Sequence, residues 1–157
     1  MAEVLVLVEH ADGAPKKVTA ELITAARVLG EPAAVVVGKP GTAAALTDAL
    51  KEAGAAKIYV AESDDVENYL ITPYVDVLAS LVEQNSPAGV LLAASADGKE
   101  IAGRLAARVG AGILTDVVEV KEGGKAVHSI FGGAFTVEAE STGELPVITV
   151  RPGAIEA

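Results

Sequence analysis

Residues 89–117 read GVLLAASADGKEIAGRLAARVGAGILTDV, and this stretch decides the fold of the chain. The apolar run 89–94 has the length and continuity of a strand that is buried on both faces. Asp97 and Glu100 have the spacing of a capping box, which predicts that a helix begins there, and Gly110 is a suitable end for it. A further apolar strand closes the stretch. A buried strand, a helix and a second strand in close succession are typical of a parallel α/β sheet.

The first half of the chain repeats this alternation. Three more apolar runs of strand length alternate with segments whose apolar residues recur at helical spacing, and Pro73 suits the first turn of one of these helices. The predicted strands lie at 4–8, 33–37 and 57–60, and glycines 30 and 54 are predicted helix ends. We therefore expect a Rossmann-like, mostly parallel sheet in a three-layer α/β/α sandwich.

The alternation of strands and helices ends after residue 114. Four predicted strands, at 115–120, 126–131, 135–139 and 146–151, follow one another with no room for helices. In the third of them apolar Phe135, Val137 and Ala139 alternate with polar residues, as in a half-exposed strand. We expect an antiparallel extension of the sheet after residue 114, within a single α/β domain that covers residues 1–153.

Composition limits the classes of function. The chain has 157 residues with a net charge of −10, and half of them are hydrophobic. That charge argues against binding to nucleic acid or to an anionic membrane surface. There is no cysteine, which excludes disulfides, thiolate catalysis and iron–sulfur ligation. The first residues carry no basic or long apolar segment. We expect a cytoplasmic location.

The loop that follows the predicted strand at 89–94 is the best candidate for a ligand site. Ser95 and Gly98 are small, so a ligand could approach the backbone, and the helix start behind them favours an anion such as a nucleotide phosphate. Asp97, as the expected cap, would repel that phosphate. The glycine-rich dinucleotide fingerprint is absent after the first strand, where residues 9–13 read EHADG, and no P-loop occurs.

Other polar residues form no recognisable catalytic set. His10 and His128 are the only histidines, and no carboxylates accompany them at the spacing of a metal site. Arg104 and Arg108 lie one turn apart, opposite the apolar stripe of their helix, where either surface ion pairs or an interface would use them. We expect no catalytic residue, no metal ligand and no enzyme activity in this chain.

Three segments carry a resemblance to a known family. They are residues 4–10, VLVLVEH; the stretch from Gly98 to Val117; and residues 149–152, TVRP. Together and in this order they resemble the N-terminal domain of the alpha subunit of electron-transfer flavoproteins. Residues 131–134 read FGGA where the family often has Tyr-Ala-Gly-Asn, so we do not expect here a polar contact of the kind that the asparagine could make in relatives.

The resemblance implies a flavin-dependent electron carrier. In that family an FAD-binding C-terminal domain holds the cofactor, so residues 154–157 would begin a linker to a domain absent from this chain, and no cofactor is expected on the chain alone. The full heterodimer with a beta subunit would carry electrons through FAD from acyl-CoA dehydrogenases of fatty acid β-oxidation, and from other dehydrogenases, to a quinone oxidoreductase. This domain would be a scaffold, with a relict nucleotide site at residues 95–98.

A second interpretation is a stand-alone nucleotide-binding domain of the universal-stress type. That class shares the alternation of strands and helices. Its nucleotide loop carries a later glycine followed by serine or threonine, whereas residues 110–112 read GAG and offer no hydroxyl. A small hydrolase is a third interpretation, but it would need a nucleophile and a base that the sequence does not show.

Overall fold

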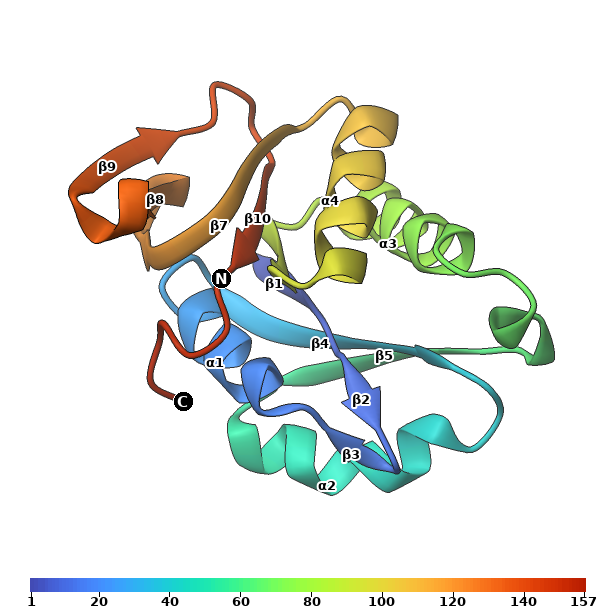
Figure 1. Ribbon diagram of the computed structural model, residues 1–157. Coiled ribbons are helices and arrows are strands. Elements are labelled where there is room, and N and C mark those ends of the chain that lie inside the picture. The colour runs from blue at the N-terminus through green and yellow to red at the C-terminus, as the bar shows by residue number, and fades with distance from the viewer.

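The computed structural model describes all residues 1–157 and shows one large sheet with helices on both faces (Figure 1). The strands and helices are β1 (Glu3–Leu7), β2 (His10–Ala11), β3 (Ala14–Pro15), α1 (Lys17–Ala26), β4 (Glu31–Gly38), α2 (Thr42–Ala53), β5 (Lys57–Glu62), the 3-10 turn η1 (Asp64–Glu67), α3 (Thr72–Asn85), β6 (Gly89–Ala93), α4 (Ala96–Val109), β7 (Gly112–Lys121), the 3-10 turn η2 (Glu122–Gly124), β8 (Lys125–Ile130), the 3-10 turn η3 (Phe131–Gly133), β9 (Phe135–Glu140) and β10 (Pro146–Val150). The predicted α/β sandwich is confirmed.

The eight-stranded sheet has the order β5-β4-β1-β6-β10-β7-β8-β9. Six neighbouring strands of the sheet, β5, β4, β1, β6, β10 and β7, run parallel to one another. Only the pairings of β7 with β8 and of β8 with β9 are antiparallel. The antiparallel part therefore begins one strand later than expected, because β7 pairs in parallel with β10. The last strand, β10, lies inside the sheet between β6 and β7 rather than at its edge.

Each face of the sheet has its own core. Alternate residues of the central strands point to opposite faces, as in Val4 and Val6 against Leu5 and Leu7. One face packs under α1 and α2 and the other under α3 and α4. Burial on both faces is what the continuous apolar runs predicted.

Several boundaries differ from the sequence-based expectation. Helix α1 ends at Ala26, four residues before Gly30, because the chain tightens into a turn there. The acidic segment after β5 forms the 3-10 turn η1. Residues 9–13, expected as a loop, begin a small β2–β3 hairpin in which Asp12 and Gly13 both adopt positive φ. Asp-Gly is a strong hairpin signal, so this hairpin could have been predicted from the sequence.

The β8–β9 hairpin is more exposed than its alternating sequence suggested. Phe135 and Val137 remain exposed, and only Ala139 of that apolar set is partly buried. The physical reason is visible in Figure 1, where the hairpin extends beyond the helices that cover the parallel strands. The apolar side chains toward the tip of the hairpin, among them Phe135 and Val137, are therefore left exposed.

Candidate functional site

A cleft opens at the carboxyl edge of the sheet between β1 and β6. The chain leaves β1 toward β4 on one side and returns to β6 on the other, which makes this the switch point where doubly wound sheets bind ligands. The cleft has a volume of about 310 Å³. Its lining consists of Leu7, Val8, Glu9, His10, Lys16, Ile71, Tyr74, Ser95, Ala96, Asp97 and Ile101.

Ser95 caps helix α4. Its backbone is extended, and its hydroxyl accepts a hydrogen bond from the backbone N–H of Gly98 at 3.0 Å. The expected capping box of Asp97 with Glu100 is therefore wrong, since Asp97 already lies inside the first helical turn. A serine with extended dihedrals three residues before that N–H is itself a favourable cap. The first turn consequently begins two residues earlier than expected.

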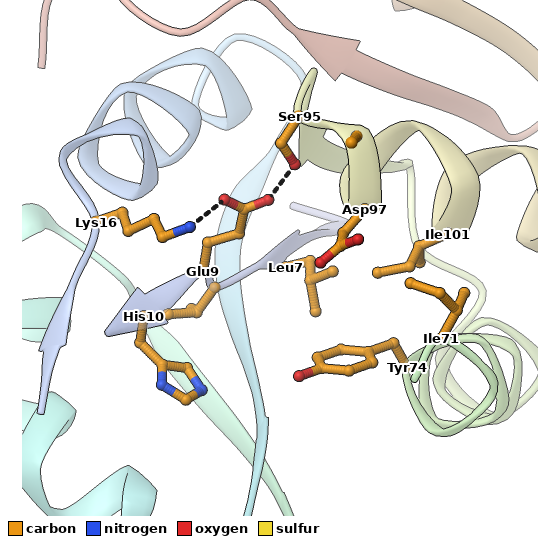
Figure 2. Close-up of a pocket in the computed structure, with 11 residues that line it drawn as sticks. Leu7, Glu9, His10, Lys16, Ile71, Tyr74, Ser95, Asp97 and Ile101 are labelled. Carbon is orange, nitrogen blue, oxygen red and sulfur yellow. Dashed lines mark hydrogen bonds and ion pairs between the residues drawn. The ribbon is translucent and has the colours of Figure 1, made fainter. Parts of the chain in front are cut away.

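The Ser95 hydroxyl also donates a hydrogen bond to the carboxylate of Glu9 (Figure 2). Lys16 lies 3.4 Å from the other oxygen of the same carboxylate, which is 18% exposed. The Glu9 carboxylate thus lies beside the helix start, where a ligand phosphate was considered. An anion is already present there, and it belongs to the protein.

A second carboxylate makes the cleft still less suitable for an anion. Figure 2 shows Asp97 on α4 and Tyr74 on α3 directed into the cleft. Burial raises the pKa of the Tyr74 hydroxyl, and the negative charges of Asp97 and Glu9 raise it further. Lys16 is the only cation among the lining residues. These residues do not fit the pyrophosphate of a dinucleotide such as FAD, which would need cations and free N–H donors.

Gly98 is required by packing. A Cβ at this position would lie 1.9 Å from the carbonyl oxygen of Ala93, so only glycine lets α4 approach β6 so closely. Gly98 is buried and does not line the cleft. Of the residues singled out from the sequence, Ser95 lines the cleft and Gly98 supports the helix behind it.

The two arginines of α4 lie away from the cleft. Arg104 pairs with Glu100 on the same helix at 2.6 Å, and Arg108 pairs with Asp76 of α3. The structure therefore does not bring Arg104 together with Ser95. His10 lies at the rim, where its Nε2–H donates to the carbonyl of Val37 at 3.2 Å.

A polar cluster that sequence reasoning missed ties together β7, β8 and β10. Arg151 donates to both carboxylate oxygens of Asp116 and to the carbonyl of Ser129. Asp116 has a φ of 58°, and its backbone N–H donates to the buried hydroxyl of Thr149 at 2.8 Å. The two motifs that carry the family resemblance in the second half of the chain thus contact one another directly.

No group of three or more His, Cys, Asp or Glu side chains is arranged to hold a metal ion. None of the helices combines the length and apolar character that a membrane crossing requires.

The fold and the cleft define a doubly wound α/β domain in which a protein carboxylate lies at the helix start of the switch point. The family model described as "Electron transfer flavoprotein domain" matches residues 4–157, and the chain belongs to this family.

Relatives in several bacteria are similar to this chain. The electron transfer flavoprotein subunit alpha of Mycobacterium tuberculosis (strain CDC 1551 / Oshkosh) is 78% identical over all 157 residues, which cover 49% of that protein. The subunit of the same name from Syntrophomonas wolfei is 36% identical over 99% of this chain and 50% of its own length. Subunit LctC of an Acetobacterium woodii lactate dehydrogenase (NAD(+),ferredoxin) is 34% identical over 83% of this chain and 33% of its own. The chain spans about half the length of the alpha subunits it matches.

Proposed function

We propose that this chain is the assembly domain of an electron transfer flavoprotein, and that it pairs with a beta subunit through the β8–β9 hairpin. The exposed apolar surface of that hairpin carries the proposal. Phe131 is 77% exposed and Phe135 is 61% exposed, with ring centroids 5.7 Å apart in an edge-to-face arrangement. Exposed aromatic clusters of this kind are typical of the centre of protein interfaces.

The strand register supports an interface on one defined face. Ala126 pairs with Ala139, His128 with Val137 and Ile130 with Phe135, and directly opposite residues share a face. At the base of the hairpin this face joins the core beneath α1, since Ala126 is fully buried. Toward the tip it becomes uncovered. A partner packing there would extend the domain core rather than add a separate contact.

The remaining activity is proposed for the whole heterodimer. It would carry electrons through FAD from acyl-CoA dehydrogenases and other dehydrogenases to a quinone oxidoreductase. Residues 1–153 would form the scaffold, residues 154–157 would lead into the FAD domain, and this chain would contribute no catalytic residue. The carboxylates of Glu9 and Asp97 support FAD being held outside this chain, because they oppose a pyrophosphate at the switch-point cleft.

The pairing is tested by co-purification. A tagged beta subunit from the same organism is co-expressed with this chain and with the double variant Phe131→Ser/Phe135→Ser. We expect the unaltered chain to co-purify at a one-to-one ratio and the double variant to be lost. Leu70→Ser, which removes an even more exposed apolar side chain near the far edge of the sheet, is the control. Failure of the folded, unaltered chain to bind the beta subunit would overturn the assembly role.

The proposal that FAD is held outside this chain is tested by a visible absorption spectrum of the purified chain after incubation with FAD and desalting. We expect no retained flavin absorbance. Stoichiometric flavin would place the cofactor on this chain and contradict the scaffold role.

The second candidate function is nucleotide binding of the universal-stress type, which the position of the cleft at the switch point supports and its carboxylates oppose. Calorimetric titration with AMP and ATP separates the two. Micromolar affinity that disappears in Ser95→Tyr would support this alternative, whereas we expect no measurable heat of binding.

A further inference from the structure

A groove runs along the free edge of β5, at the opposite edge of the sheet from the β8–β9 hairpin. Two adjoining cavities form it, with volumes of about 430 and 370 Å³. Ala61 of β5 and Asp76 and Val77 of α3 line both of them. Residues 59–62 of β5 form one wall of the groove, and α3 forms the other.

The groove is apolar inside and open at its rim. The lining that both cavities contribute is mainly aliphatic and aromatic: Val37, Tyr59, Val60, Val66, Tyr69, Pro73 and Leu81. Tyr69 is 58% exposed, and the adjacent Leu70 is 88% exposed. Tyr69 lines the groove and Leu70 is the next residue along the chain, so these two exposed side chains form a contact surface beside the groove that the domain itself leaves uncovered.

The edge strand adds hydrogen-bonding capacity. β5 pairs with β4 on one side and has no neighbour on the other. Such an edge presents unpaired backbone N–H and C=O groups, and proteins normally protect it with a proline, a bulge or a central charge. The middle of β5, Ile58-Tyr59-Val60-Ala61, has none of these. An extended chain could pair with this edge and direct alternate side chains into the groove.

The charge around the groove selects the partner. Five carboxylates surround its η1 end: Glu62, Asp64, Asp65, Glu67 and Asp76. Only two of these carboxylates have a cationic partner: Glu67 pairs with Lys39 at 3.1 Å, and Asp76 pairs with Arg108. Glu62 accepts hydrogen bonds from the N–H groups of Gly41 and Ala43, which lower its pKa and keep it ionised. Asp65 has no ion-pair partner and lines the groove, so it is the carboxylate free to meet a cation.

We propose that the β5–α3 groove is a docking site for an extended segment of another protein in which lysine or arginine alternates with bulky apolar residues. The segment adds a strand to β5, its apolar side chains enter the two cavities, and a basic side chain lies against Asp65. A second copy of this chain fits poorly, because each copy would bring the same excess of carboxylates to the contact. The groove and the hairpin lie seven strand spacings apart, roughly 30 Å, so both can be occupied at once. This inference does not rest on the proposed function.

The probe is a fluorescein-labelled eight-residue peptide that alternates lysine with valine, titrated with this chain and followed by anisotropy. Amide chemical shifts in a 15N-labelled sample locate the contact. We expect saturable binding, with shifts concentrated at residues 58–66 and 73–81. A peptide with glutamate in place of lysine, and one with serine in place of valine, are each expected to bind at least about tenfold more weakly.

Two variants with one matched control complete the test. Asp65→Lys and Leu70→Ser are each expected to weaken the lysine–valine peptide about tenfold or more. Asp48→Lys makes the same charge change at an exposed position on α2, on the other face of the sheet, and is expected to change affinity less than about twofold.

Three results would overturn this docking site. The first is an equal loss of peptide affinity in Asp48→Lys, which would mean general attraction to an acidic protein. The second is a set of chemical-shift changes confined to the β8–β9 hairpin. The third is a concentration-dependent shift at residues 58–66 without peptide, which would mean that a second copy of the chain fills the groove. Failure to co-purify with a beta subunit would leave this result unaffected, because the hairpin is at the other edge.

Discussion

Arg151 holds both carboxylate oxygens of Asp116, with its Nε 3.2 Å from Oδ1 and its Nη2 2.9 Å from Oδ2. The two residues are 35 positions apart: Asp116 lies on β7, and Arg151 directly follows the neighbouring strand β10. A third hydrogen bond joins Arg151 to the carbonyl of Ser129 at 3.1 Å. The guanidinium therefore fixes the point at which the antiparallel hairpin leaves the parallel sheet.

The substitution Asp116→Asn tests how much this ion pair contributes to the free energy of unfolding, and how that contribution depends on pH. Asparagine tolerates the positive φ at this position, so the backbone is preserved. The Arg151 hydrogen bonds lower the pKa of Asp116 below its ordinary value. The stabilisation is therefore complete above the unfolded-state pKa of about 4 and is lost as the pH falls through the lower folded-state pKa. Both side chains are about 40% exposed, so we expect a loss of only about 0.5–1 kcal/mol at pH 7.

Urea denaturation of the Asp116→Asn variant between pH 7 and pH 3 measures this difference, which should shrink toward the acid end. Glu100→Gln, which breaks the exposed pair with Arg104, is the control and should cost less than about 0.5 kcal/mol. A difference for Asp116→Asn that stays constant with pH would contradict the assignment of its stability to the ion pair.

Gly98→Ala and Gly103→Ala separate packing from helix propensity within one helix. Alanine at 98 would place its Cβ 1.9 Å from the Ala93 carbonyl oxygen, whereas nothing lies within 4 Å of a Cβ at 103. We expect Gly98→Ala to lose about 1–3 kcal/mol through overpacking and Gly103→Ala to gain about 0.5–1 kcal/mol. Midpoints of urea denaturation report both values. Equal effects at the two positions would contradict the close approach of α4 to β6.

Ser95→Ala and Asp97→Asn decide which residue caps α4. Removing the Ser95 hydroxyl leaves the N–H of Gly98 without its capping partner and leaves the Glu9 carboxylate with Lys16 alone, so we expect a loss of about 1 kcal/mol. Asp97→Asn should change the stability by less than about 0.5 kcal/mol, because this side chain makes no capping bond and lies near Glu9. Thermal denaturation at neutral pH distinguishes them. The reverse ranking would restore the cap expected from the sequence.

Phe131→Ser/Phe135→Ser should leave the isolated domain almost intact. Both rings are mostly exposed, and the main interaction lost is their edge-to-face contact, so we expect a cost below about 1 kcal/mol. Urea denaturation of the chain alone supplies the measurement. A large loss of stability would mean that the rings hold the hairpin together, and the co-purification test would then need single substitutions.

Local patterns predicted the elements of this fold well. Continuous apolar runs located the buried strands, and glycines such as Gly54 and Gly110 marked helix ends by adopting positive φ. The place of β10 was harder to predict. Its sequence is that of any buried strand, and pairing with β6 and β7 depends on contacts across more than thirty residues.

The candidate site was predicted only in part, because its chemistry depends on distant residues. Ser95 was found from its place after a strand, but the Glu9 carboxylate beside it comes from 86 positions earlier. Helix α2 gives a similar case. Its N-cap, Gly41, has no side chain, and the carboxylate of Glu62 on β5 binds the N–H groups of Gly41 and Ala43 instead. Neither contact leaves a local signal in the sequence.

The interior position of β10 has a consequence for synthesis on the ribosome. Until residues 146–150 have emerged, β6 and β7 lack the strand that lies between them, and their backbone groups have no sheet partner on that side. The ribosome must therefore synthesise β7, β8 and β9 before β10 can pair with β6 and β7 and complete the sheet. Nascent chains that stall before this point expose two apolar parallel edges, which makes them substrates for chaperones and proteases.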